Sequence, residues 1–344
     1  MRLRQFRRVF LSSSGGIERR LRTSVFYLYN NYGPPEYAES QTRYNLYMEK
    51  RSGRYKLWLD IGLLYCAAIW GSTFIVVKDA LAGVHPVAMV AIRFGMAALL
   101  LLPWVLRRPR FSAHLKEGAI LSVFLTALYI TQTYGLVYTS AANSGFITGL
   151  FIIFIPVFMF LRRRQRPKKL EALSAGLAVY GLWLLTGGAE GFNKGDALTL
   201  IAAVSYAAHV VITDKYIKGK VDMLLLAFHQ FWCVSLTAFL LSAVMGYPLA
   251  VASAKLWWII IFLALFPTLS AYFIQMVAQK DCEPFRIGLI FTLEPVFAAL
   301  FAWTMGGEQF LLVKAAGGFL IVSGMMMGEA ANFKARPKKE KLSV

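Results

Sequence analysis

The chain has 344 residues, of which 58% are hydrophobic and 16% charged, and its net charge is +19. Soluble domains average roughly 25% charged residues, so this composition excludes an ordinary soluble globule. The apolar residues form blocks that reach the roughly 20 residues a bilayer-spanning helix needs, whereas a membrane barrel would show short alternating segments. The sequence therefore predicts an all-α polytopic membrane protein.

Residues 1–57 precede the first apolar block and are expected to form a basic cytoplasmic N-terminal tail without function of its own. They carry twelve Lys and Arg against four Glu, and no block among them is long enough to span a membrane. Three interpretations stay open: contact with anionic membrane lipid, an organelle-targeting peptide, or a true start at Met48. We favour the start at Met48, because nothing in residues 1–47 connects physically to the rest.

Ten apolar blocks follow, and each is predicted to form one transmembrane helix. Short polar turns such as TSAAN (139–143) and MGGEQ (305–309) make neighbouring helices antiparallel. The blocks run approximately over residues 58–77, 86–106, 118–138, 143–161, 170–188, 195–213, 223–246, 256–279, 284–304 and 309–328.

The distribution of Lys and Arg predicts the orientation in the membrane. With the N-terminus in the cytoplasm, the tails and inside loops hold 31 of the 37 basic residues, and the outside loops hold three. This asymmetry is the positive-inside pattern, and it places both termini, including the basic tail 329–344, in the cytoplasm. Basic residues that alternate with apolar blocks also argue against nucleic acid as a partner.

A repeated phrase divides the blocks into two halves. GLFIIFIPVF (149–158) and GLIFTLEPVF (288–297) share five of ten residues, and WGSTFIVVKD (70–79) sits near the place of SYAAHVVITD (205–214). The halves are residues 58–188 and 195–328, with five predicted helices each. Since five is odd, the second half enters the membrane from the opposite face. Inverted repeats of this kind are typical of secondary transporters, whose substrate site lies near the midplane between the halves.

These phrases also carry a resemblance to a known family. Three features resemble the first domain of the EamA family: the phrase WGSTF, the set Pro86, Met89 and Arg93, and the stretch YTSAANSGFITGLFIIFIPVF (138–158). The end of the family's second domain is similar to IGLIFTLEPVFAALFAWTMGGEQF (287–310). The resemblance covers about residues 60–328. The family belongs to the drug/metabolite transporter superfamily. The resemblance implies ten helices and the transport of amino acids, metabolites, drugs or sugar derivatives. Export from the cytoplasm is the direction that it leads us to expect.

Two charged residues inside the predicted spans are candidates for coupling. Glu294 lies ten residues into the ninth block. Inserting a carboxylate at the centre of a bilayer costs about 2.5–3.5 kcal/mol on insertion scales, so Glu294 must face a cavity or a partner, or be protonated. The first copy of the repeat has Ile155 there. Arg93 could pair with Glu294 or meet an anionic substrate group, and the alternative is a side chain that snorkels to the interface. A proton is therefore a candidate partner of the chain.

Polar and aromatic residues within the spans predict a substrate cavity for amphipathic small molecules, including organic cations that bind aromatic faces. The alternative for each residue is a hydrogen bond between packed helices. Pro156 and Pro295, at equivalent places in the two copies, are candidate hinges that would kink their helices. The predicted cavity residues are Trp70, Ser72, Thr73, Tyr129, Gln132, Asn143, Thr148, Tyr206, His209, Tyr272, Gln275 and Glu294.

The sequence thus predicts a plasma-membrane permease that exports a small metabolite, amino acid or drug-like molecule by alternating access, without cofactor or metal. A channel and a non-transport scaffold are the alternatives, and a membrane acyltransferase is a minor one that rests on the H-x-x-x-x-D spacing of His209 and Asp214. The GxxxG pairs 145/149 and 324/328 allow close helix packing, so both a monomer and a homodimer are compatible with the sequence.

Overall fold

A computed structural model describes residues 53–163, 169–219, 221–282, 287 and 290–334. Most of the N-terminal tail, with Met48, and the last ten residues of the C-terminal tail lie outside the described residues, as does part of the predicted ninth span. The described residues from Trp58 onward form one compact unit.

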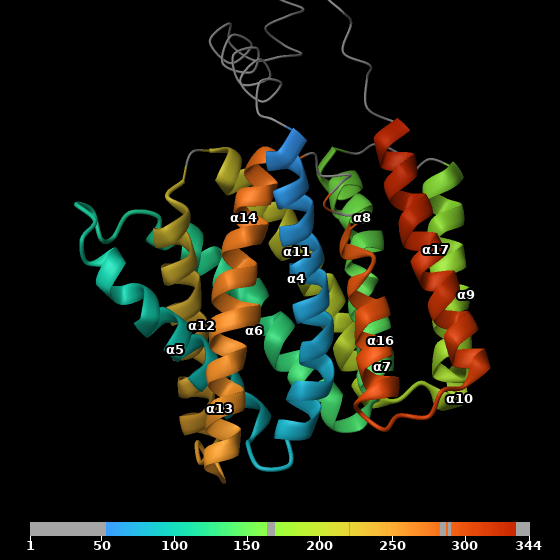
Figure 1. Cartoon of the computed structure of the whole chain (residues 1–344), viewed down its shortest axis with the longest axis horizontal. Coiled ribbons are helices and arrows are strands. Elements are labelled where there is room, and N and C mark those ends of the chain that lie inside the picture. The colour runs from blue at the N-terminus through green and yellow to red at the C-terminus, as the bar shows by residue number, and fades with distance from the viewer. Residues whose placement is uncertain (1–52, 164–168, 220, 283–286, 288–289, 335–344) are drawn as a thin grey trace, which may run out of the picture. The chain divides into compact units, whose positions relative to one another are not determined.

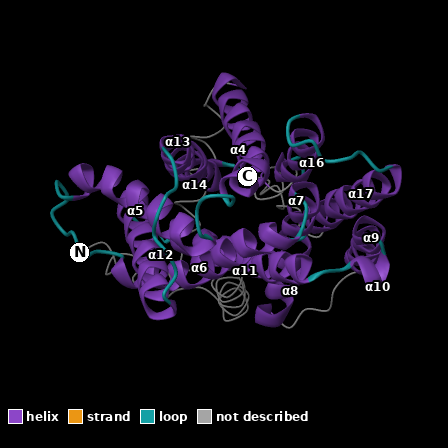
Figure 2. Ribbon diagram, turned by 90° about the horizontal axis from the view of Figure 1, so that it is seen from below, coloured by secondary structure: helices purple, strands orange, loops and turns teal. Residues whose placement is uncertain are grey.

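The described elements are helices (Figures 1 and 2). They are α4 (Gly53–Ala80), α5 (Pro86–Val105), α6 (Leu115–Tyr138), α7 (Ala141–Gly149), α8 (Phe151–Arg163), α9 (Lys169–Thr186), α10 (Gly188–Gly191), α11 (Lys194–Lys218), α12 (Met223–Met245), α13 (Ala254–Leu263), the π-helical segment η1 (Ala264–Ser270), α14 (Ala271–Asp281), α16 (Glu294–Thr304) and α17 (Leu312–Lys334).

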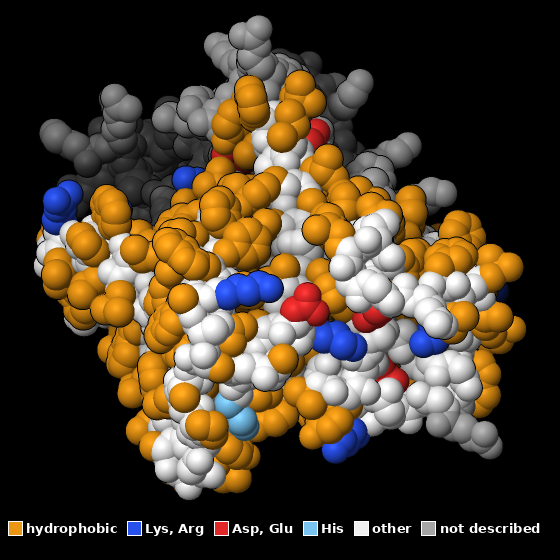
Figure 3. Space-filling model, turned by 60° about the horizontal axis from the view of Figure 1, so that its bottom comes forward, with side chains coloured by type: hydrophobic (Ala, Val, Ile, Leu, Met, Phe, Trp, Pro, Cys, Tyr) orange, Lys and Arg blue, Asp and Glu red, His pale blue; other side chains and the backbone are white. Residues whose placement is uncertain are grey.

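Six helical stretches in the described part of the chain are long and apolar enough to cross a membrane. They are Leu57–Ala80, Pro86–Val105, Leu115–Tyr138, Lys194–Lys218, Met223–Met245 and Ala254–Asp281. Three shorter apolar helices, Ala141–Ile155, Ala172–Thr186 and Leu312–Gly328, lie among them. Hydrophobic side chains cover much of the surface in Figure 3, as expected for helices that face lipid. The prediction of an all-helical, multi-pass membrane protein is confirmed.

The fourth and the eighth predicted spans are interrupted, as is the ninth, described below. The fourth block is divided at Leu150 into α7 and α8, and the eighth contains the π-helical turn η1 around Pro267. Proline has no N–H, so the carbonyl of Leu263 loses its usual donor, and the Thr268 hydroxyl donates to it at 2.8 Å. The wider turn leaves the Pro267 carbonyl free to accept a hydrogen bond from the Trp70 indole at 2.7 Å.

The ninth block differs most from its prediction. A turn at residues 292–293 precedes α16, so Glu294 and Pro295 begin a helix rather than lying within one. The first turn of a helix has no intrahelical partner for its N–H groups, so proline is accommodated there without a lost hydrogen bond. A new helix thus starts where Pro295 was expected to kink the ninth span, and its role as a hinge stays a prediction. The position also favours Glu294, because helix N-termini stabilise negative charge.

Glycines let α4 and α7 approach α16 closely. A Cβ on Gly71 would lie 2.8 Å from the Glu294 carbonyl oxygen, and one on Gly145 would lie 2.3 Å from the Ala298 Cβ. Gly149 faces Pro295, and the second GxxxG pair, Gly324 and Gly328, faces Ser174 of α9. All four GxxxG glycines thus take part in contacts within the chain.

His85 and two tyrosines form a cluster that joins the two halves at one end of the helices. The His85 Nδ1 accepts the Val87 N–H at 3.4 Å and so caps α5. The His85 Nε2 lies 3.2 Å from the Tyr134 hydroxyl, and the imidazole ring stacks on Tyr247 with ring centroids 4.2 Å apart. Beside it, Val84 pairs with Val251 as an isolated β-bridge.

Acidification is expected to loosen this cluster. Burial lowers the pKa of His85, so the unfolded chain binds its proton more tightly than the folded one. The contribution of neutral His85 to the free energy of unfolding is therefore fully present above the usual histidine pKa of about 6.5. It declines as the pH falls below that value, because a protonated Nδ1 can no longer accept the Val87 N–H. The Tm in detergent should fall more for wild type than for His85→Asn, which keeps a capping oxygen, between about pH 7.5 and pH 5. Equal falls would contradict this role.

Candidate functional site

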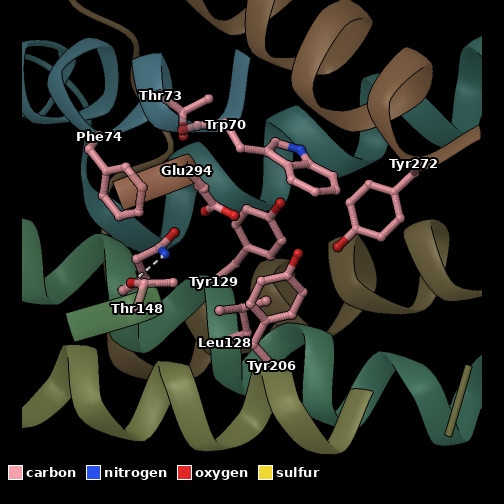
Figure 4. A pocket seen from close by; sticks show the side chains of 10 residues that line it. Trp70, Thr73, Phe74, Leu128, Tyr129, Thr148, Tyr206, Tyr272 and Glu294 are labelled. Atoms are coloured by element: carbon pink, nitrogen blue, oxygen red, sulfur yellow. Dashed lines mark hydrogen bonds between the residues drawn. The ribbon is translucent and has the colours of Figure 1, made fainter. Parts of the chain in front are cut away.

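A small cavity lies where six helices meet, α4, α6 and α7 from the first half and α11, α14 and α16 from the second (Figure 4). Its volume of about 30 Å³ has room for one or two waters. The residues that line it are Trp70, Thr73, Phe74, Leu128, Tyr129, Gln132, Thr148, Tyr206, Tyr272 and Glu294.

Glu294 is the acid of this cavity. Its side chain is 4% exposed, and in the described part of the chain its Oε2 has no hydrogen-bond partner. In Figure 4 the carboxylate points into the group of aromatic rings formed by Trp70 and Tyr129. Leaving a buried charged oxygen without a partner is costly, so this oxygen is available to a proton or to a donor group on a ligand.

Aromatic side chains form most of the cavity wall. The Trp70 ring lies edge-on to Tyr272, with ring centroids 6.0 Å apart, and to Phe291 at 5.3 Å. Tyr206 packs on Phe151 at 4.1 Å. The hydroxyl groups of Tyr206 and Tyr272 point toward the middle of the site (Figure 4). The wall therefore combines ring faces with hydroxyl donors.

An amide and two threonines form the polar remainder of the wall. The Gln132 amide nitrogen donates to the Thr148 hydroxyl at 3.1 Å, and the Thr73 hydroxyl donates to the Trp70 carbonyl at 2.6 Å. Gln132 and Thr148 link α6 to α7 within the first half. The Gln132 amide oxygen and the hydroxyl oxygens can accept further hydrogen bonds from a ligand.

Arg93 lies outside the cavity wall, behind Tyr129. Its Nε donates to the Thr268 hydroxyl at 2.7 Å, and its guanidinium carbon lies 4.8 Å from the Tyr129 ring centroid. The side chain is 4% exposed, so in this conformation it is buried rather than snorkelling. Among the described residues no ion pair joins Arg93 to Glu294.

Eight of the twelve predicted cavity residues line the cavity, and the other four have places elsewhere. Ser72 donates to the Ile69 carbonyl at 2.8 Å, and Asn143 and Gln275 are buried outside the wall. His209 Nε2 lies 3.0 Å from Gln230 Oε1, while Asp214 accepts from Lys218 at 2.6 Å. The structure therefore does not bring His209 and Asp214 together as an acyltransferase pair.

Sequence reasoning missed two apolar members of the wall. Phe74 follows Trp70 by four residues on α4, and Leu128 precedes Gln132 by four on α6. Residues four apart lie on the same face of a helix, so this spacing could have identified both.

The two candidate hinge prolines lie in different settings. Pro295 is buried at the start of α16, next to Glu294 and against Gly149 of α7. Pro156 lies within α8, and its side chain is outside the described residues. Within the described part of the chain no three His, Cys, Asp or Glu side chains gather as metal ligands would.

Comparisons with known proteins identify one family and several relatives that are named as transporters. The sequence model of the EamA-like transporter family matches residues 57–187 and again residues 193–327. An "uncharacterized transporter" of Archaeoglobus fulgidus is 32% identical over 79% of this chain and 86% of its own. The inner membrane transporter YedA of Escherichia coli is 24% identical over 70% of this chain and 80% of its own. The S-adenosylmethionine/S-adenosylhomocysteine transporter of Chlamydia trachomatis is 26% identical over 71% and 80%.

A solved crystal structure has the same fold, with a TM-score of 0.59 and 17% identity over 80% of this chain and 98% of that one. At this identity the likeness concerns the fold alone. The family match covers far more than half of the residues, and the apolar helices form a multi-pass membrane protein. The chain belongs to the EamA-like transporter family of membrane transporters.

Proposed function

We propose that the chain is a secondary transporter of ten transmembrane helices, in which two inverted five-helix halves alternate around the cavity at Glu294. The observation that carries the proposal is a buried carboxylate with an unpartnered oxygen, enclosed by aromatic rings from both halves. Such a site can hold a proton or a ligand group, and because its carboxylate is largely shielded from bulk solvent, its occupancy can bias one conformation over another.

The packing of the helices supports two related halves. Residues 58–188 supply α4 to α9, and residues 195–328 supply α11 to most of α17. The equivalent helices α5 and α12 pack together, as do α9 and α17, and α7 and α16. The contact of α6 with α11 has its counterpart in α4 with α14, where the Cys66 thiol donates to the Ala271 carbonyl at 3.4 Å. Two successive matches of the same family model also support this division.

The orientation is proposed from charge. The excess of Lys and Arg in the tails and in alternate loops supports cytoplasmic termini, and the family and the YedA relative support placement in the cell membrane. Export from the cytoplasm is proposed from the family resemblance. The basic tails 1–57 and 329–344 then lie at the cytoplasmic surface.

The lining of the cavity favours an amphipathic substrate with a positive charge. Ring faces attract cations, and Glu294 supplies an opposite charge in a site shielded from water. The chlamydial relative is named for S-adenosylmethionine and S-adenosylhomocysteine, which both carry an adenine ring and an amino group, and the first of them also a sulfonium cation. Because the cavity of about 30 Å³ is smaller than such molecules, the halves must separate to admit one.

Proton coupling follows if substrate and proton compete for Glu294. A cation bound at the carboxylate would displace the proton, and a proton would release the cation.

The alternative functions fit this site less well. A channel would more often use a ring of like charges from identical subunits, and a scaffold would not need a carboxylate buried among aromatic rings.

A ligand screen tests the proposal. Amino acids, organic cations, sugars and nucleosides would be added to purified protein in detergent, and the Tm of wild type and of Glu294→Gln would be measured. Ligands that bind the folded state raise the Tm. We expect a compound, cationic at neutral pH, that stabilises wild type and loses this effect in the variant. A compound that stabilises both equally would place its site away from Glu294.

A further inference from the structure

Glu308, in the loop between α16 and α17, makes contacts that the cavity does not explain. Its Oε1 accepts the Ala141 N–H at 2.6 Å, and its Oε2 accepts the Ala142 N–H at 3.3 Å. The carboxylate thus caps the first two N–H groups of α7, although it comes from the other half of the chain. Ser140 already caps α7 locally by accepting the Asn143 N–H at 3.0 Å, so Glu308 adds a second cap from a distance.

Lys78, at the last turn of α4, joins the same contacts. Its Nζ lies 3.8 Å from Glu308 Oε1 and donates to the Thr139 carbonyl at 2.6 Å. Thr139 ends α6, and its hydroxyl donates to Asp196 in the first turn of α11. We call the contacts of Lys78, Glu308, Thr139, Asp196 and the α7 N-terminus the latch.

The latch connects helices that line the cavity. Glu308 is fixed to α16, since its N–H donates to the Ala302 carbonyl at 3.1 Å. The latch therefore holds ends of α4, α6, α7, α11 and α16, which are five of the six cavity helices. In Figure 1 the loop after α16 lies at the lower ends of the helices, and Figure 3 shows acidic and basic side chains gathered near the middle of that end.

The distance between latch and cavity is short. Lys78 is five residues beyond Thr73, and Ala141 is seven residues before Thr148, which corresponds to roughly 7–10 Å along a helix. Asp196 is fully buried, Thr139 is 4% exposed, and the Glu308 side chain is 16% exposed. A molecule that enters the cavity from this end must therefore separate these groups.

The chemistry of the latch suits reversible opening. It consists of hydrogen bonds and one ion pair at helix ends, and water can replace each of them once the halves part. The Gly-lined contacts of α4 and α7 with α16 are instead close packing contacts, made in part with the α16 backbone. From this geometry we infer that the latch is the outer gate of the transporter: it seals the cavity from the proposed outer side, where α4 and α6 end and α7 and α11 begin, and it must open in each transport cycle. The inference rests on the proposed alternating access and orientation.

α16 links the gate to the cavity. Glu294 is its first residue, and Glu308 is attached to its last turns. A shift of this 11-residue helix when Glu294 exchanges its occupant would therefore move Glu308 away from α7. This coupling explains why the two acids, one at each end of α16, belong to one mechanism.

Cysteine accessibility tests the gate without a known substrate. In a background with Cys66→Ser, Cys233→Ser and Cys282→Ser, a Thr73→Cys reporter in the cavity wall would be labelled with a membrane-impermeant maleimide added from the outside. Glu308→Ala should raise the labelling rate by about tenfold or more, since charge-assisted hydrogen bonds are lost. Lys78→Met should raise it less, because the α7 N-terminus stays capped by Glu308.

The control is Asp214→Asn, which removes a similar ion pair with Lys218 at the other end of α11 and should leave labelling from the outside unchanged. If Glu308→Ala does not fold, Glu308→Gln keeps one acceptor and should give a smaller rise. Unchanged labelling in every folded latch variant, or a rise only from the cytoplasmic side, would overturn the gate. If the latch variants raise the labelling rate but the protein moves no ligand in vesicles, the proposed transport function is contradicted and the gate is not.

Discussion

Replacing Glu294 with Gln is expected to reduce ligand binding and transport by about 10- to 100-fold. The substitution keeps the size of the side chain and removes the charge, and hydrogen bonds to charged groups contribute about 1.5–3 kcal/mol. Each 1.4 kcal/mol corresponds to about tenfold in affinity. Folding should be maintained, because a buried oxygen without a partner is easier to accommodate on a neutral amide than on a carboxylate.

The measurement is ligand uptake into proteoliposomes together with the associated proton movement. Glu117→Gln is the matched control, since Glu117 also lies in the first turn of a helix but outside the cavity wall. We expect the control to behave as wild type, and the Glu294 variant to lose both uptake and proton movement. Uptake and proton movement that persist in Glu294→Gln would remove this residue from the mechanism.

The second large effect is expected from Gly71→Ala. The added Cβ would lie 2.6 Å from the Phe297 Cβ, 2.8 Å from the Glu294 carbonyl oxygen and 2.9 Å from the Ala298 nitrogen. Two of these atoms belong to the α16 backbone, so α4 and α16 must separate. Overpacking of this kind costs about 1–3 kcal/mol, against a gain in helix propensity of at most about 1 kcal/mol.

Thermal unfolding in detergent and ligand-induced stabilisation would both be measured on Gly71→Ala. Gly176→Ala on α9 is the matched control, because a Cβ there meets nothing within 4 Å, and it should be neutral or slightly stabilising. We expect a lower Tm and a weaker ligand response for Gly71→Ala, since the displaced backbone carries Glu294. Equal Tm values for the two variants would mean that α4 does not pack against α16 as described.

Strong periodic signals in the sequence predicted much of the fold. Ten apolar blocks and the repeat of GLFIIFIPVF in GLIFTLEPVF were sufficient to expect a polytopic helical protein and a division near residue 190. The interruptions were harder to predict. Leu150 is an ordinary apolar residue, and the only local signal is Gly149 at the end of α7, a weak one, since a single glycine within an apolar block is also common in a continuous membrane helix.

Glu294 shows both the strength and the limit of the sequence. A lone carboxylate in an apolar block is a reliable sign of a functional or partnered group, and it does line the cavity. Its place at the start of α16 was not expected, because the sequence reads as one continuous block. Proline at position 295 was the available signal, since it is favoured in the first turn of a helix.

The latch was the part of the site that sequence reasoning did not find. Lys78 and Glu308 are 230 positions apart, and each taken alone looks like an ordinary interfacial charge. Only the fold brings Glu308 to the α7 N-terminus, where its carboxylate meets backbone N–H groups that no sequence pattern reveals.

Counterflow in proteoliposomes tests alternating access most directly. Vesicles loaded with an unlabelled compound that stabilises wild type would be diluted into a trace of the same compound in labelled form. A carrier predicts a transient accumulation of label above its outside concentration, because each inward-moving site returns with unlabelled ligand, and Glu294→Gln should abolish this overshoot. The contrary result is that the compound passes through the protein but its label only equilibrates, without an overshoot. That result would contradict alternating access and favour a channel.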